Sequence, residues 1–94
     1  MRIALTERFQ SDVSALDDAC RAAIFQTMLA LPGALGHAHA HAHAGPGLRK
    51  IHASGIWEAR VGLGLRLIFT LVDQTVTLVR AGTHDDVRRF LRSL

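Results

Sequence analysis

The fold is decided by the stretch Gly55-Ile56-Trp57-Glu58-Ala59-Arg60-Val61, Gly62-Leu63-Gly64, Leu65-Arg66-Leu67-Ile68-Phe69. Two runs with alternating apolar residues flank a short segment bounded by glycines, which is typical of an antiparallel β-hairpin. If residues 62–64 form the loop, Val61 lies opposite Leu65 and Arg60 lies opposite Arg66. The two arginines then project from one face, and Trp57 points into the core from the other.

The next turn extends this register to a third strand. If Asp73-Gln74 is a two-residue turn, Arg66 lies opposite Ala81, close to the exit of the last strand toward His84. We therefore expect Arg60, Arg66 and His84 to meet at one end of the sheet. Like charges directly opposite each other destabilise a sheet, so this arrangement suits an anion, and phosphate is the obvious candidate.

The rest of the chain predicts an α+β fold of a single domain over residues 1–94. A strand is expected over 2–7, and apolar residues at helical spacing follow, as one long helix or two short ones joined near Asp17 and ended by Pro32-Gly33. An antiparallel four-stranded meander is expected at 48–52, 56–61, 65–72 and 75–81. A short C-terminal helix over 85–94 has Thr83 as its N-cap, and the helices are expected against one sheet face.

A histidine-rich tract interrupts this pattern. Residues 34–47 are poor in large apolar groups, which predicts a flexible surface loop. Its four histidines, spaced by two, could chelate zinc, nickel or copper adventitiously or contact RNA: His37, His39, His41 and His43. The predicted site itself needs neither a metal nor a cofactor.

Charge is distributed unevenly along the chain. The net charge is +3 overall, with residues 1–44 slightly acidic and residues 45–94 strongly basic. A basic half that also holds the predicted site favours a polyanionic partner. Cys20 is the single cysteine, and no apolar run approaches the roughly 20 residues that span a membrane. These observations predict a cytoplasmic protein with no membrane partner.

The order and spacing of three motifs resemble a known family. The motifs are Ser54-Gly55-x-Trp57-x-x-Arg60, Arg66-Leu67-Ile68-Phe69 and Gly82-Thr83-His84-Asp85. Together they resemble the RelE superfamily of bacterial toxin–antitoxin systems, most strongly over residues 47–90. The superfamily contains ribosome-dependent mRNA endonucleases and ParE-like inhibitors of DNA gyrase. The resemblance implies a type II toxin of RelE-like fold that cleaves mRNA on the ribosome and is neutralised by a cognate antitoxin.

The resemblance also implies roles for individual residues. Arg66 matches the arginine that holds the scissile phosphate, His84 matches the general acid, and Arg60 is a second phosphate ligand. The residues assigned to RNA binding are Arg49, Lys50, His52 and Arg88. Some members place a general-base carboxylate just before the second strand, where this chain has Gly45-Pro46-Gly47. The nearest acidic residue, Glu58, lies on a different strand, and Arg88 stands where many members have an aromatic residue.

Three alternatives come from other classes of function. A ParE-like gyrase inhibitor would share the fold without using His84 for catalysis. A cleavage-dead RelE-like domain would keep only the binding of antitoxin or nucleic acid. A metal-handling protein would depend on the histidine tract.

Overall fold

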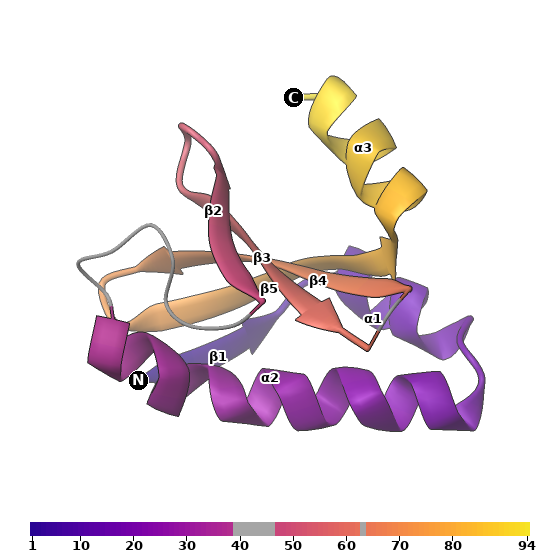
Figure 1. Cartoon of the computed structure of the whole chain (residues 1–94), viewed down its shortest axis with the longest axis horizontal. Coiled ribbons are helices and arrows are strands. Elements are labelled where there is room, and N and C mark those ends of the chain that lie inside the picture. Colours follow the sequence, from indigo (N-terminus) through magenta and orange to yellow (C-terminus); the bar gives the residue numbers. More distant parts are fainter. Residues whose placement is uncertain (39–46, 63) are drawn as a thin grey trace.

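The structure, a computed structural model, describes residues 1–38, 47–62 and 64–94 and has the predicted α+β architecture (Figure 1). Its elements are β1 (Arg2–Leu5), α1 (Glu7–Ser14), α2 (Asp18–Ala38), β2 (Leu48–His52), β3 (Ile56–Val61), β4 (Leu65–Val72), β5 (Thr75–Thr83) and α3 (His84–Arg92). The bounds predicted for the second to fourth strands agree with the structure. The first strand is shorter than predicted because Thr6 already caps α1.

The five strands form one sheet in the order β1-β5-β4-β3-β2. The antiparallel meander from β2 to β5 is confirmed, and β1 adds to it in parallel beside β5. Val61 pairs with Leu65 and Arg60 with Arg66, as predicted. Asp73 and Gln74 form the two-residue β4–β5 turn with φ of 49° and 65°, values typical of a type I′ turn.

The predicted pairing of Arg66 with Ala81 is wrong by one residue. A β-bulge falls where Ile68 pairs with Arg80 and Phe69 pairs with Leu78, which leaves Val79 as the extra residue of β5. Arg66 consequently pairs with Gly82. A one-residue shift exchanges the two faces of a strand, so Ala81 joins the core and Arg66 stays on the opposite face.

Helices cover both faces of the sheet, not one face as predicted. Figure 1 shows α1 and α2 on one side of the sheet and α3 on the other. The larger apolar cluster packs sheet residues such as Trp57 and Phe69 against residues of α1 and α2. The smaller cluster packs Val87 of α3 against Ile56 and Ile68. Side chains alternate across a strand, so both faces of β3 and β4 carry buried apolar residues.

Helix α2 continues past Pro32-Gly33, where the sequence predicts its end. Proline removes one helical hydrogen bond and costs about 3 kcal/mol within a helix. Burial outweighs this cost, because Leu31 and Leu35 on either side of the proline are buried against the sheet. The predicted 34–47 loop is therefore helical as far as Ala38, and residues 39–46 lie outside the described residues.

The break between α1 and α2 falls near Asp17, as predicted. Thr6 Oγ1 accepts a hydrogen bond from the Phe9 N–H at 3.1 Å and caps α1. Asp17 Oδ1 accepts one from the Cys20 N–H at 2.8 Å and starts α2. Within the described ranges, no helix combines the length and the apolar character needed to cross a membrane.

Candidate nucleic-acid interface

A pocket of about 440 Å³ lies between the β2–β3 edge of the sheet and helix α3. The strands contribute Arg49, Lys50, Ile51 and Glu58 to its lining. The helix contributes His84, Val87, Arg88 and Leu91. Four predicted site residues therefore lie around one pocket. Three of them are basic arginine or lysine side chains, so the pocket favours an anionic ligand.

His84 is the first residue of α3 and is exposed. A capping box fixes this end of the helix: Thr83 Oγ1 accepts from the Asp86 N–H at 3.2 Å, and Asp86 Oδ2 accepts from the Thr83 N–H at 2.8 Å. The hydrogen bond from the Thr83 N–H lowers the pKa of Asp86. Gly82 belongs to the same corner, because a Cβ there would lie 2.5 Å from Asp86 Oδ2. The backbone before His84 is therefore closely constrained.

Arg66 does not line the pocket that contains His84, but it pairs with Glu58, which does. Its Nε is 3.6 Å from Glu58 Oε1, and its Nη1 donates to the Leu65 carbonyl at 2.9 Å. The Arg66 side chain is 13 % exposed and the Glu58 side chain 6 % exposed. Arg49, directly opposite Glu58 on β2, places its Nε 3.6 Å from the same oxygen. One buried carboxylate thus separates two arginines.

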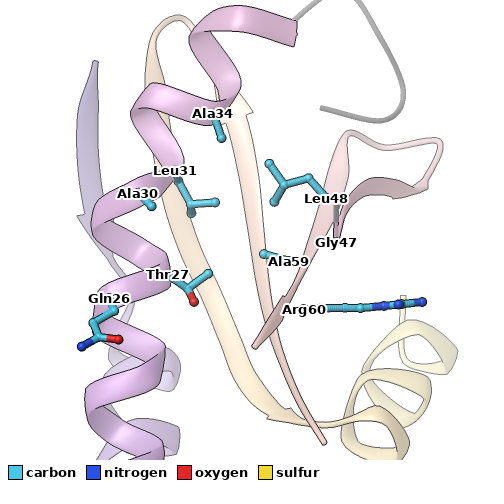
Figure 2. Close-up of a pocket in the computed structure, with 9 residues that line it drawn as sticks. All are labelled: Gln26, Thr27, Ala30, Leu31, Ala34, Gly47, Leu48, Ala59 and Arg60. Atoms are coloured by element: carbon cyan, nitrogen blue, oxygen red, sulfur yellow. The ribbon is translucent and has the colours of Figure 1, made fainter. Parts of the chain in front are cut away.

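Arg60 borders a second pocket, of about 300 Å³, between α2 and strands β2 and β3. Figure 2 shows its side chain extending away from α2, so only its base meets this pocket. Its backbone N–H donates to the Gly47 carbonyl at 2.9 Å. By register, Arg60 is opposite Arg66, which is opposite Gly82, two residues before His84. The structure therefore brings Arg60, Arg66 and His84 to one end of the sheet.

His52 lies apart from the pocket that contains His84, at the β2–β3 turn. Its Nδ1 accepts a hydrogen bond from the Ser54 N–H at 3.1 Å and lies 2.6 Å from Ser54 Oγ. His37 falls in the last turn of α2, and His39, His41 and His43 lie outside the described residues. Among the residues that the structure does describe, no three His, Cys, Asp or Glu gather as a metal site would require.

Two features of the site region were missed from the sequence. Glu58 was noted only as the nearest acid, although the hairpin register places it on the same face as Arg60 and Arg66. Arg80 was not singled out. Its guanidinium pairs with Asp12 of α1, with Nε 2.7 Å from Oδ2, and this hydrogen bond raises the pKa of Arg80. Asp12 also accepts a hydrogen bond from the Ala81 N–H at 3.0 Å. The Arg80 side chain therefore helps to hold α1 against β5.

Comparison with solved structures identifies toxins of the same fold. The crystal structure of the RelBE2 toxin–antitoxin complex from Mycobacterium tuberculosis contains a chain with a TM-score of 0.67 and 17% identity, covering 88% of this chain and 96% of that one. A chain of the E. coli DinJ-YafQ complex matches with a TM-score of 0.67 and 22% identity, and the match covers 93% of this chain and 98% of that one. A chain of the E. coli RelBE complex matches with a TM-score of 0.65 and 14% identity, and the match covers 87% of this chain and 94% of that one.

The likeness extends over nearly the whole length of each matched chain. No family model matches the sequence, and no curated protein matches it. The similarity is therefore one of architecture, including the N-terminal strand, the mostly antiparallel sheet and the C-terminal helix. This chain has the fold of the RelE and YafQ toxins of toxin–antitoxin systems.

Proposed function

We propose that this chain is the toxin of a type II toxin–antitoxin pair and that it cleaves mRNA on the ribosome. The observation that carries the proposal is the placement of His84 beside Arg49, Lys50 and Arg88 around one pocket, on a fold shared with RelE and YafQ. A histidine can transfer protons and the cations can bind phosphates, which together are the requirements of RNA cleavage.

The proposed reaction is metal-independent and uses the RNA's own 2′-hydroxyl as nucleophile. The 2′-hydroxyl gives its proton to a solvent water, its oxygen attacks the adjacent phosphorus, and the bond from phosphorus to the 5′-oxygen breaks. Protonated His84 gives its proton to the departing 5′-oxygen. The products are a 2′,3′-cyclic phosphate and a free 5′-hydroxyl. Proton transfer by a positioned side chain contributes roughly 10²- to 10⁴-fold to such a step.

The arginines supply the electrostatic part of the proposal. Arg66 and Arg60 stabilise the charge that develops on the phosphorane, because one guanidinium group can donate two parallel hydrogen bonds to two phosphate oxygens. Arg49, Lys50 and Arg88 hold the RNA backbone on either side of the pocket. His52, at the β2–β3 turn, would meet the RNA farther along.

The proposed protein partner is a cognate antitoxin. The RelBE2, RelBE and DinJ-YafQ structures are toxin–antitoxin complexes. A basic pocket of this kind suits an acidic segment that competes with RNA. We therefore expect the antitoxin to cover the face of the sheet that carries His84.

Induction of the protein and of its variants in a bacterial host tests the proposal. The wild type should arrest growth and leave new mRNA 5′-ends inside translated codons. Arg66→Ala and His84→Ala should each relieve the arrest. The melting temperature of His84→Ala should stay close to that of the wild type, whereas that of Arg66→Ala should fall, because buried Glu58 loses one of its two compensating charges. Arg2→Ala is the matched control, since Arg2 is an exposed arginine on β1, at the opposite edge of the sheet.

The same experiment separates the alternatives. Double-strand breaks and an SOS response with intact messages would favour the ParE-like alternative over RNA cleavage. Antitoxin binding without any growth arrest or cleavage would favour a domain that has kept only its binding surface. Full toxicity of both variants at normal expression would contradict the shared phosphate site.

A further inference from the structure

Glu58 is the only buried charged side chain among the described residues. It lies in the middle of β3, is 4 % exposed and contributes to the pocket that contains His84. A buried carboxylate costs several kcal/mol unless opposite charges compensate it. An acidic residue in a pocket that otherwise gathers cations therefore needs an explanation.

Both compensating charges approach the same atom. Glu58 Oε1 is 3.6 Å from the Nε of Arg49 on β2 and 3.6 Å from the Nε of Arg66 on β4. These distances make ion pairs and exceed the range of N–H···O hydrogen bonds. The carboxylate thus joins three neighbouring strands through one oxygen. It also separates two guanidinium groups that would otherwise repel each other.

This arrangement determines which donors remain for a ligand. A guanidinium has five N–H donors in a planar fork, and in both arginines the Nε side is turned toward Glu58. The Arg66 Nε is buried and makes no hydrogen bond among the described residues. Arg66 Nη1 already donates to the Leu65 carbonyl, so the second hydrogen of Nη1 and the Nη2 group of Arg66, with the terminal nitrogens of Arg49, are the donors left to meet a phosphate. Arg60, directly opposite Arg66, adds a third positive charge to the same face.

We propose that Glu58 is a positioning residue, which holds Arg49 and Arg66 side by side as a two-arginine clamp for an RNA phosphate. This proposal rests on the proposed function and extends it to one residue. The 6 % exposure of the Glu58 side chain leaves almost no surface for a ribose hydroxyl. Glu58 therefore acts through the arginines and does not take a proton from the substrate.

Glu58→Gln tests this role, because it removes the charge and keeps the shape. The probe is a short RNA with a 2′-deoxy substitution at the scissile nucleotide, which binds without being cleaved. We expect Glu58→Gln to weaken its binding at least tenfold and to leave the shape of the pH profile of cleavage unchanged. Glu7→Gln is the matched control, because it makes the same chemical change at an exposed position in α1.

A double-mutant cycle shows whether Glu58 acts through Arg66. Groups that act as one unit are not additive, so Glu58→Gln should weaken binding by a smaller factor in the Arg66→Ala background than in the wild type, and the loss that remains there comes from Arg49. The NMR signals of the Arg49 and Arg66 Nε–H groups should shift in Glu58→Gln and stay in place in Glu7→Gln. If Glu58→Gln does not fold, Glu58→Asp serves instead and should give smaller changes in the same direction.

Three outcomes would overturn the proposal. One is unchanged RNA binding with unchanged arginine signals in a folded Glu58 variant. Another is loss of the acidic limb of the pH profile with normal binding, which would make Glu58 a general base. The third is full additivity in the cycle. A wild type that binds the probe but cleaves no RNA would count against the proposed function alone, because the binding and NMR measurements still test the clamp.

Discussion

The two faces of the sheet differ in what they bury. Among the described residues, the cluster under α1 and α2 holds fifteen buried apolar residues, whereas the cluster under α3 holds three. The first face therefore supplies most of the burial that stabilises the fold. The second face carries the basic side chains, Glu58 and His84. Its small apolar patch packs against α3. Stability and the candidate site are thus assigned to opposite sides of the same strands.

Substitution in the larger cluster should have the largest effect on stability. Phe69 is fully buried and stacks on Trp57, with ring centroids 6.2 Å apart. We expect Phe69→Ala to lower the free energy of unfolding by about 3–5 kcal/mol, a large share of the roughly 5–15 kcal/mol that stabilises a typical domain. Urea unfolding followed by circular dichroism measures the loss. A loss below about 1 kcal/mol would contradict the assignment of stability to this face.

Substitution in the smaller cluster should act locally. Val87 of α3 packs on Ile56 and Ile68, and Val87→Ala removes two buried methyl groups, worth about 2 kcal/mol. We expect the amides of α3 to lose hydrogen-exchange protection while those of β4 keep theirs. RNA cleavage should fall with the α3 signals, because His84 and Arg88 are on this helix. Equal loss of protection in α3 and β4 would show that the two faces unfold as one unit.

The capping box at the start of α3 should make that face sensitive to acid. The Thr83 N–H lowers the pKa of Asp86 in the folded protein. A lowered carboxyl pKa stabilises the fold above the ordinary value near 3.9 and ceases to do so as the pH falls through the folded-state pKa. Asp86→Asn should therefore lower the melting temperature at pH 7, by about 1–3 °C because the side chain is 40 % exposed.

The difference in melting temperature between Asp86→Asn and the wild type should shrink as the pH falls through the lowered pKa of Asp86, because the wild-type carboxyl then loses its charge. Thermal melts of both proteins from pH 7 to pH 2 test this. A difference that stays constant over the whole range would mean that the charge of Asp86 contributes nothing and that only its shape matters.

The smallest expected effect is a gain in stability at the β4–β5 turn, which joins two strands that contribute to both faces of the sheet. Asp73 and Gln74 have positive φ, a conformation that Asn-Gly adopts more readily. Replacing the pair by Asn-Gly should raise the free energy of unfolding by about 0.5 kcal/mol and leave cleavage unchanged. Urea unfolding of the double variant checks it. A decrease in stability would indicate that Asp73 or Gln74 makes a favourable interaction that the turn conformation does not explain.

The sequence predicts the meander well because its connections are short. Three residues separate β3 from β4 and two separate β4 from β5, so the pairing next to each connection follows from its length. The bulge at Val79 lies beyond the reach of that argument. Its signal is a break in alternation, since the buried core positions of β5 are 76, 78 and 81. Reading this break would have placed Arg66 opposite Gly82.

Other differences arise from packing that no local pattern encodes. Pro32 indicates a helix end, but Leu31 and Leu35 gain enough burial to carry α2 through it. The helical spacing of Val87, Phe90, Leu91 and Leu94 predicts a buried side for the C-terminal helix without indicating which sheet face it meets. For the candidate site, register alone placed Arg60, Arg66 and His84 at one end of the sheet. The buried position of Glu58 between Arg49 and Arg66 required the spatial order of three strands.

The pairing of β1 with β5 has a consequence for synthesis on the ribosome. Arg2 pairs with Thr75, so the first strand leaves the ribosome long before β5, its neighbour in the sheet. Contacts so distant in sequence slow folding, and a growing chain keeps this sheet edge open until β5 has been made. Helix α3 follows β5 directly and supplies the wall of the pocket that holds His84. A nascent chain therefore has no assembled site while the earlier elements are being translated.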